Sequence, residues 1–196
     1  MVNTVMDRIH EMFNNKRLRY VLLKSRYPIF LIAVIILILN IKPAWFAVGC
    51  IVAFFGELIQ LWCFASLDKN KMLAVKGPYM LMRNPMYMGR FFLLLGVLLL
   101  VGNSWILFVF TVSYYFYMVN RVKREEAKLQ PLFGESYRKY CQQVNRFVPS
   151  LKAVDWESLW FFSWNLLLKN NGHWNFIAML VCFFMFYFFT FVYSTS

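Results

Sequence analysis

The stretch GPYMLMRNPMYMG, residues 77–89, joins a polar loop to an apolar segment and contains two prolines. The residue before a proline is disfavoured in the helical conformation, so Gly77-Pro78 and Asn84-Pro85 each interrupt the chain. The loop therefore exposes backbone N–H and C=O groups beside the apolar segment. At a membrane boundary such groups are tolerated only where protein or a polar cavity covers them. The stretch indicates one wall of a polar site, with a simple passage from loop to helix as the alternative.

A second polar signature, RVKREEAKL at residues 121–129, follows two apolar runs that are joined by a short turn at residues 102–104. If the two runs form a hairpin through a bilayer, both signatures emerge on the same side. Arg121 and Glu125 are four residues apart, so we expect them to lie on one face of a helix. An ordinary salt bridge is the alternative interpretation of this pair. We expect Glu126 to point elsewhere, toward a helix end or the basic loop.

The composition excludes several classes of protein. The 196 residues are 61% hydrophobic and 15% charged, more apolar than one soluble core would hide, which indicates a membrane protein. The net charge is +12, and the charged residues lie between apolar segments. We therefore expect them to set the membrane topology and to contact anionic headgroups, not nucleic acid. Four cysteines without paired spacing and two distant histidines predict neither a disulfide framework nor a metal site.

Apolar segments recur along the chain and predict an all-α integral membrane protein with about five transmembrane helices. They comprise residues 28–41, 44–67, 87–101, 105–120 and 174–193. The second and fifth reach the roughly 20 residues of a full span, whereas the others must borrow flanking residues. Residues 150–172 mix aromatic and charged side chains and predict an amphipathic interfacial helix, with a helix packed on the cytoplasmic side as the alternative.

Basic residues predict the orientation. With the N-terminus in the cytoplasm and five spans, only Lys42 of the 21 Lys and Arg residues falls outside. This agrees with the positive-inside rule, and it places the basic segment 1–27 and both signatures on the cytoplasmic side. We therefore expect a multi-pass protein of a bacterial inner membrane, or of the endoplasmic reticulum if the source is eukaryotic, which contacts the lipid bilayer.

Glu57 lies inside the second apolar segment, where an ionisable group is costly and is a functional candidate by default. A structural partnership with Arg83, Arg90 or a backbone group is the alternative.

Two local patterns bear on the helices. We expect Pro131 to limit the helix of the second signature and Phe133-Gly134 to end that unit. Gly49, Ala53 and Gly56 permit close helix packing, and they leave the oligomeric state open.

The two signatures together resemble the integral-membrane methyltransferases that include isoprenylcysteine carboxyl methyltransferase and the phospholipid N-methyltransferases, in a compact prokaryotic form. The shared pattern is Gly-x-Tyr-x-x-x-Arg-His/Asn-Pro-x-Tyr-x-Gly, a hairpin, Glu-Glu-x-x-Leu, Phe-Gly and Tyr-x-x-Tyr. These motifs stand here at residues 77–89, 125–129, 133–134 and 137–140. The resemblance covers residues 56–149, which we expect to be the catalytic core of a single membrane domain spanning residues 1–196, with 174–193 as an additional span.

The resemblance implies S-adenosylmethionine as cofactor, bound without a Rossmann fold, and a lipophilic or prenylated acceptor. Glu125 would meet the positively charged amino group of the cofactor, and Arg121 would face the acceptor and position it. Glu126 and Glu57 are further catalytic candidates. The residues that the resemblance places against the cofactor are Lys71, Met72, Leu73, Ala74, Tyr79, Asn84, Pro85, Met86, Tyr87 and Glu125.

Two positions depart from the family pattern. Asn84 replaces the usual His of Arg-His-Pro, and an amide forms hydrogen bonds but does not titrate as a base. Gln60 replaces an Arg, which puts an anion contact there in doubt.

The chemistry of the acceptor separates the alternatives. A carboxylate is ionised at neutral pH and needs no general base, and Arg121 is able to hold it by a charge-assisted pair. An amine must lose a proton, and Glu57 or Glu126 would have to accept it. This favours carboxyl methylation over phospholipid N-methylation. An NADPH-dependent enzyme similar to sterol reductases, which share an Arg-His-Pro-x-Tyr pattern, and a non-enzymatic scaffold are the other hypotheses.

Overall fold

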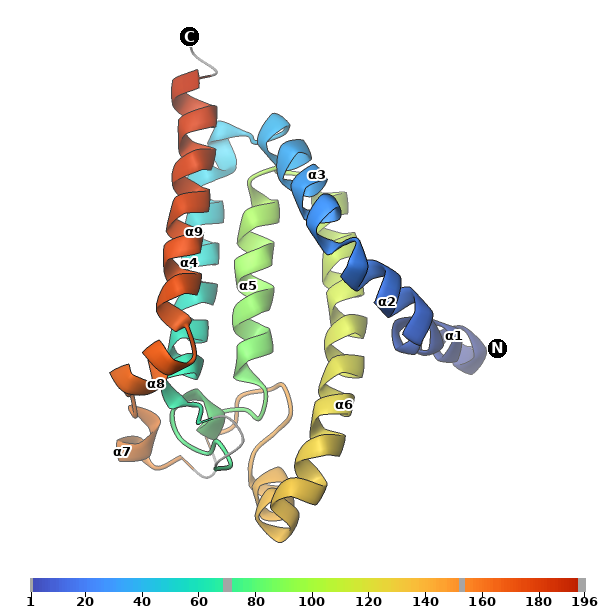
Figure 1. Cartoon of the computed structure of the whole chain (residues 1–196), viewed down its shortest axis with the longest axis vertical. Helices are drawn as coiled ribbons and strands as arrows, with labels where there is room; N and C mark the ends of the chain where they lie inside the picture. The colour runs from blue at the N-terminus through green and yellow to red at the C-terminus, as the bar shows by residue number, and fades with distance from the viewer. Residues whose placement is uncertain (1, 69–71, 152–153, 194–196) are drawn as a thin grey trace.

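The computed structural model describes residues 2–68, 72–151 and 154–193, and this part of the chain contains helices and no strands. The prediction of an all-α protein is confirmed. Helices α4, α5, α6 and α9 run along the long axis of the molecule, and α3 crosses it obliquely (Figure 1). The α-helices are α1 (Val2–Asn14), α2 (Lys16–Lys24), α3 (Arg26–Leu39), α4 (Pro43–Ser66), α5 (Pro85–Leu99), α6 (Ser104–Gln143), α7 (Trp156–Leu159), α8 (Trp164–Lys169) and α9 (Gly172–Tyr187), with a 3-10 helix at Gly77–Met80 and a π-helical turn at Phe188–Val192.

Helices α4 and α5 pack backbone against backbone. A Cβ atom on Gly56 would lie 2.3 Å from the backbone nitrogen of Leu93, and one on Gly96 would lie 2.3 Å from that of Ala53. Gly49 meets the same helix at the carbonyl oxygen of Gly96. The small residues of α4 are therefore used for a contact within the chain, where only small side chains let two helices approach so closely.

The predicted hairpin is formed by α5 and α6. Its turn lies beside the start of α4, because the backbone N–H of Lys42 donates to the carbonyl of Leu100 at 2.8 Å and its ammonium donates to that of Gly102 at 3.2 Å. The Asn103 side chain caps the start of α6 by accepting hydrogen bonds from the backbone N–H groups of Trp105 and Ile106. This turn and the two polar signatures lie at opposite ends of the molecule (Figure 1).

Helix α6 is longer than the sequence predicted. The expected stop at Pro131 is wrong, because helical structure continues on both sides of this proline as far as Gln143. The break falls at Gly134, whose φ of 51° and ψ of −124° are not helical, so the prediction that Phe133-Gly134 ends the unit is confirmed. A proline removes one helical hydrogen bond, whereas a left-handed φ, which glycine adopts readily, redirects the whole axis. The second signature thus extends straight out of the hairpin before the chain turns back.

The segment 150–172 contains two short helices, α7 and α8, so the prediction of one continuous helix is wrong, while its interfacial position stays a prediction. Asp155 accepts hydrogen bonds from two backbone N–H groups at the start of α7, and the Ser163 hydroxyl accepts one, from Leu166, at the start of α8. Each cap starts a helix of its own, which divides the segment. Trp160, between them, stacks on Trp62 of α4 with ring centroids 6.0 Å apart.

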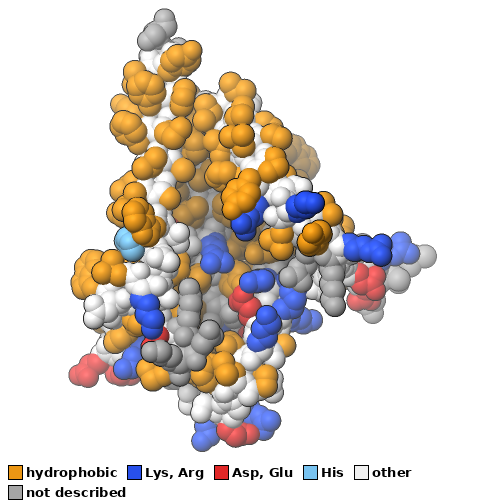
Figure 2. All heavy atoms as spheres, viewed as in Figure 1, with side chains coloured by type: hydrophobic (Ala, Val, Ile, Leu, Met, Phe, Trp, Pro, Cys, Tyr) orange, Lys and Arg blue, Asp and Glu red, His pale blue; other side chains and the backbone are white. Residues whose placement is uncertain are grey.

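Two helical stretches of the described chain are long and apolar enough to cross a membrane, α4 and residues 172–192, while α3 and α5 are shorter apolar helices. Large apolar side chains on α3 and α9 point outward, such as Leu31 (61% exposed) and Phe184 (69% exposed). Figure 2 shows apolar side chains over the upper part of the molecule and charged ones over the lower part. This division is typical of a protein whose upper part lies in lipid.

Candidate functional site

The first signature is held in a fixed shape at the lower end of the molecule. Gly77 has a φ of 61°, and a Cβ atom there would lie 2.2 Å from Oγ of Ser66, so only glycine fits. The Tyr140 hydroxyl donates to the carbonyl of Tyr79 at 2.6 Å. The loop is therefore attached to the end of α6 and not merely to its neighbours in sequence.

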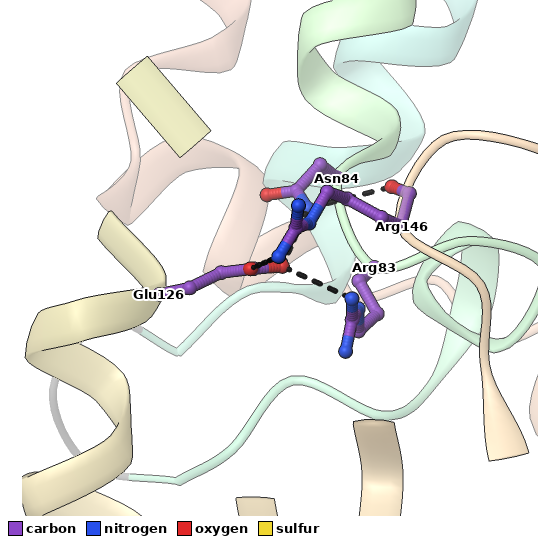
Figure 3. A network of polar contacts seen from close by, with 4 residues as sticks. All are labelled: Arg83, Asn84, Glu126 and Arg146. Carbon is purple, nitrogen blue, oxygen red and sulfur yellow. Dashed lines mark hydrogen bonds and ion pairs between the residues drawn. The ribbon is translucent and has the colours of Figure 1, made fainter. Parts of the chain in front are cut away.

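Glu126 connects both signatures to the segment after α6. Its carboxylate lies 3.4 Å from an Nη atom of Arg83 and 2.5 Å from one of Arg146, and the Asn84 amide donates to it at 3.5 Å. Figure 3 shows the carboxylate reaching from α6 between the two guanidinium groups. Only 12% of the Glu126 side chain is exposed, so removing one partner would leave a poorly solvated charge. The expected contact of Glu126 with the basic loop is confirmed.

Arg121 and Glu125 form the predicted pair on one face of α6. The Arg121 Nε lies 2.9 Å from Oε1 of Glu125 and donates to the Tyr87 hydroxyl at 3.3 Å. The hydrogen bond to Tyr87 raises the pKa of the Arg121 guanidinium, against the opposite effect of burial, so it stays a cation. The side chains of Arg121 and Glu125 are 43% and 38% exposed, so both are accessible to a ligand.

A cavity of about 460 Å³ lies where the two signatures meet. The hairpin therefore brings them together, as the sequence predicted. Pro85 is buried at the start of α5 without lining the cavity, and Lys71 lies outside the described residues. The predicted site residues on its wall are Met72, Leu73, Ala74, Tyr79, Asn84, Met86, Tyr87, Arg121 and Glu125.

Glu57 and Glu126 do not line this cavity. Glu57 is 1% exposed inside α4, and the Gln60 amide donates to its Oε2 at 3.0 Å. Its structural partner is therefore this amide and neither Arg83 nor Arg90. A catalytic role for Glu57 or Glu126 stays a prediction.

Several wall residues were not assigned by the sequence. Tyr137 and Tyr140 belong to the Tyr-x-x-Tyr motif, and the sequence predicts no role for either ring. Burial raises the pKa of both phenols, so they are neutral donors at physiological pH. The Tyr137 hydroxyl is buried beside the Cys141 thiol and has no hydrogen-bond partner of normal geometry among the described residues. A buried donor of this kind calls for a partner, which a ligand would supply.

The wall residues together give the cavity a mixed chemistry. Four cationic groups line it, together with two carboxylates and a set of apolar side chains. Such a wall suits a ligand that carries an ammonium, a carboxylate and an apolar ring together. The charged members are Asp68, Arg83, Arg90, Arg121, Glu125 and Lys128, and the apolar members beyond the first signature include Leu129, Leu132 and Phe133.

Comparison with known proteins gives a consistent result. Residues 44–136 match the sequence profile of the phospholipid methyltransferase family. A protein-S-isoprenylcysteine O-methyltransferase of Xenopus laevis is 28% identical over 126 residues, which cover 58% of this chain and 44% of that protein. One of Schizosaccharomyces pombe is 33% identical over 82 residues, covering 42% and 35%. The chain thus spans less than half the length of these two curated relatives.

A relative with another name is the cobalt-zinc-cadmium resistance protein CzcN of Cupriavidus metallidurans, 25% identical over 122 residues, which cover 61% of this chain and 56% of that protein. In the part of the chain that the structure describes, no group of three or more His, Cys, Asp or Glu residues is placed to hold a metal ion. No solved structure matches the chain significantly. The profile and the isoprenylcysteine methyltransferases confirm the resemblance seen in the sequence, and residues 44–136 are similar to the phospholipid methyltransferase family.

Proposed function

We propose that this protein is a membrane-embedded methyltransferase that uses S-adenosylmethionine to methylate the carboxylate of a lipophilic acceptor, in the manner of isoprenylcysteine carboxyl methylation. The observation that carries the proposal is the cavity lined by both signatures, with Arg121 and Glu125 side by side on its wall. The names of the curated relatives support the same reaction.

The cavity residues suit the proposed cofactor. Glu125 would pair with its ammonium group, Tyr137 would donate to one of its oxygen or nitrogen acceptors, and Leu129 and Phe133 would contact its apolar parts. Residues 72–74 would offer backbone groups from the loop before the first signature. When bound, the cofactor supplies an electrophilic methyl group, and the protein needs chiefly to align the acceptor with it and exclude water.

The arrangement of carboxylates favours a carboxylate acceptor over an amine. Glu57 and Glu126, which would have to serve as bases for an amine, both lie away from the cavity wall, and Glu126 already binds two arginines. Asn84, on the wall, does not titrate. Arg121 is a cation that would hold the acceptor carboxylate and shield it from repulsion by Glu125.

The same proposal includes a topology. We propose about five membrane crossings, with α3 and α5 completed by flanking residues and the first part of α6 counted as one crossing. The N-terminus and the cavity would face the cytoplasm of a bacterium, or the cytosolic side of the endoplasmic reticulum in a eukaryote. The start of α4, which Lys42 directly precedes, lies at the end opposite to the signatures and supports this orientation (Figure 1).

The decisive experiment measures methyl transfer by the purified full chain in lipid nanodiscs. S-adenosylmethionine with a labelled methyl group is supplied with either N-acetyl-S-farnesylcysteine or phosphatidylethanolamine. We expect label in the farnesylcysteine product that alkali releases as methanol, because a methyl ester is hydrolysed by base whereas an N-methyl group is not. Alkali-stable label in phosphatidylethanolamine would instead favour N-methylation.

Calorimetric titration with S-adenosylhomocysteine provides the second readout. Binding is expected for the wild-type protein. Binding of NADPH without binding of S-adenosylhomocysteine would overturn the proposal and favour a reductase.

A further inference from the structure

A second cavity, of about 290 Å³, lies between the two N-terminal helices and α6. Its lining is mostly apolar and comes from Met12 and Phe13 of α1 and from Leu18, Leu22 and Leu23 of α2, completed by α6. Helices α1 and α2 lie before residue 44 and so outside the stretch that matches the methyltransferase family. The sequence predicted here only a basic segment, so the cavity is a feature of the tertiary structure.

Helix α1 is fixed to α6 by a buried polar contact, so the cavity has a defined wall. Asn120 is 3% exposed, its Nδ2 lies 2.9 Å from Nδ1 of His10, and its Oδ1 accepts from the Asn14 amide at 3.0 Å. Phe13 stacks on Phe116 beside this contact, with ring centroids 6.3 Å apart. Buried amides are costly unless they are paired, so this contact specifies one position for α1.

The two cavities share Arg121. Its guanidinium contacts Tyr87 and Glu125, which line the first cavity, and Arg121 also lines the second, where Arg124 is the other charged residue of a mostly apolar lining. An amphiphile whose carboxylate pairs with Arg121 would therefore have its charged end at the first cavity and an apolar place for its chain in the second.

We propose that the cavity between α1, α2 and α6 binds the apolar chain of the methyl acceptor, with the acceptor's carboxylate at Arg121. This proposal rests on the proposed carboxyl methylation and adds where the acceptor lies and which helices select it. Leu22 and Leu23 are 51% and 61% exposed, so the cavity is open along α2. A lipid-like chain would enter it sideways from the bilayer. At about 290 Å³ the cavity is near the lower limit of ordinary ligand sites, roughly 300–1,000 Å³, and suits a single chain.

The test uses a photoactivatable prenylcysteine, with a benzophenone in its apolar chain, and the full chain in nanodiscs. After irradiation, the labelled peptides are identified by mass spectrometry, and S-adenosylhomocysteine binding is measured on the same samples. We expect label on residues 11–24. An excess of unlabelled farnesylcysteine should remove the label, whereas added phospholipid should not.

Matched variants on one helix make the test specific. Leu22→Trp fills the cavity, and Val21→Trp adds the same ring at an adjacent exposed position that does not line it. We expect Leu22→Trp to reduce labelling and raise the acceptor KM by roughly tenfold, because overfilling a formed cavity is unfavourable. Val21→Trp should change neither, and both variants should bind S-adenosylhomocysteine as the wild type does.

The outcomes separate this proposal from the function on which it rests. Label on other helices, displacement by phospholipid, or equal effects of the two tryptophans would overturn the acceptor site while leaving cofactor binding intact. If the wild-type protein does not bind S-adenosylhomocysteine but is still labelled on α1 and α2, the proposed methyltransferase function is overturned. The cavity is then supported as a site for an amphiphile.

Discussion

At the scale of single residues, the site depends on how two neighbouring glutamates are used. Glu125 and Glu126 differ by one position on α6 and therefore point in different directions around the helix axis. Glu126 is enclosed between Arg83 and Arg146, whereas Glu125 stays partly exposed on the cavity wall. The Glu126 carboxylate therefore holds the loop in place, and the Glu125 carboxylate is accessible to a ligand.

Glu125→Gln tests this division of roles. We expect the affinity for S-adenosylhomocysteine to fall about tenfold or more, since a hydrogen bond to a charged group contributes about 1.5–3 kcal/mol. The measurement is calorimetric titration of the purified variant. Glu135→Gln is the matched control, because Glu135 is on the same helix, 71% exposed in its side chain, and paired with Arg138 away from the cavity. Equal affinities for the two variants would remove Glu125 from the cofactor site.

At the scale of the helices, the close crossing of α4 and α5 positions the first signature. The crossing brings the start of α5 beside the end of α4. The loop that contains Gly77 connects these two helix ends. The geometry depends on the absence of side chains at Gly56 and Gly89, whose Cβ atoms would each collide with the backbone of the other helix.

Gly56→Val is expected to separate the two helices. Forcing side-chain atoms into a packed contact costs about 1–3 kcal/mol, so the melting temperature should fall by several degrees. Thermal unfolding in detergent, followed by circular dichroism, measures the change. Ala47→Val places the same valine side chain on α4 at an exposed position, adding two carbon atoms against three at Gly56, and it should leave the melting temperature nearly unchanged. An equal loss in both variants would show that the crossing is not the cause.

At the scale of the whole molecule, charge and apolar surface are divided between its two ends. The turn near Gly102 and the start of α4 lie at the apolar end, and the cavity lies at the charged end (Figures 1 and 2). Under the proposed function, this polarity would let the water-soluble cofactor enter from one side and the lipid-like acceptor arrive from within the bilayer.

Cysteine labelling of the intact chain tests the orientation. The four native cysteines are replaced by alanine, and either Lys42→Cys or Lys139→Cys is introduced. In sealed cells, a thiol reagent that cannot cross membranes should label only the Lys42→Cys variant. Labelling of the Lys139→Cys variant should require permeabilised cells, because that end is expected to be cytoplasmic. The reverse pattern would invert the proposed topology.

The sequence by itself determined what depends on composition and local spacing. Apolar runs predicted the all-α architecture, the turn between two of them predicted the hairpin, and a spacing of four predicted the contact of Arg121 with Glu125. Proline and glycine pairs marked where the first signature begins. These features follow from helical periodicity and backbone sterics, which neighbouring residues are sufficient to set.

The tertiary structure alone decided how distant segments meet. It placed Glu126 between two arginines, paired Glu57 with Gln60, continued α6 through Pro131 up to the break at Gly134, and divided residues 150–172 into two capped helices. It also brought α1 and α2 against α6 and so made Arg121 common to two cavities. Such contacts join residues far apart in the sequence, as His10 and Asn120 are, 110 positions from each other, and they depend on packing between surfaces that no local pattern encodes.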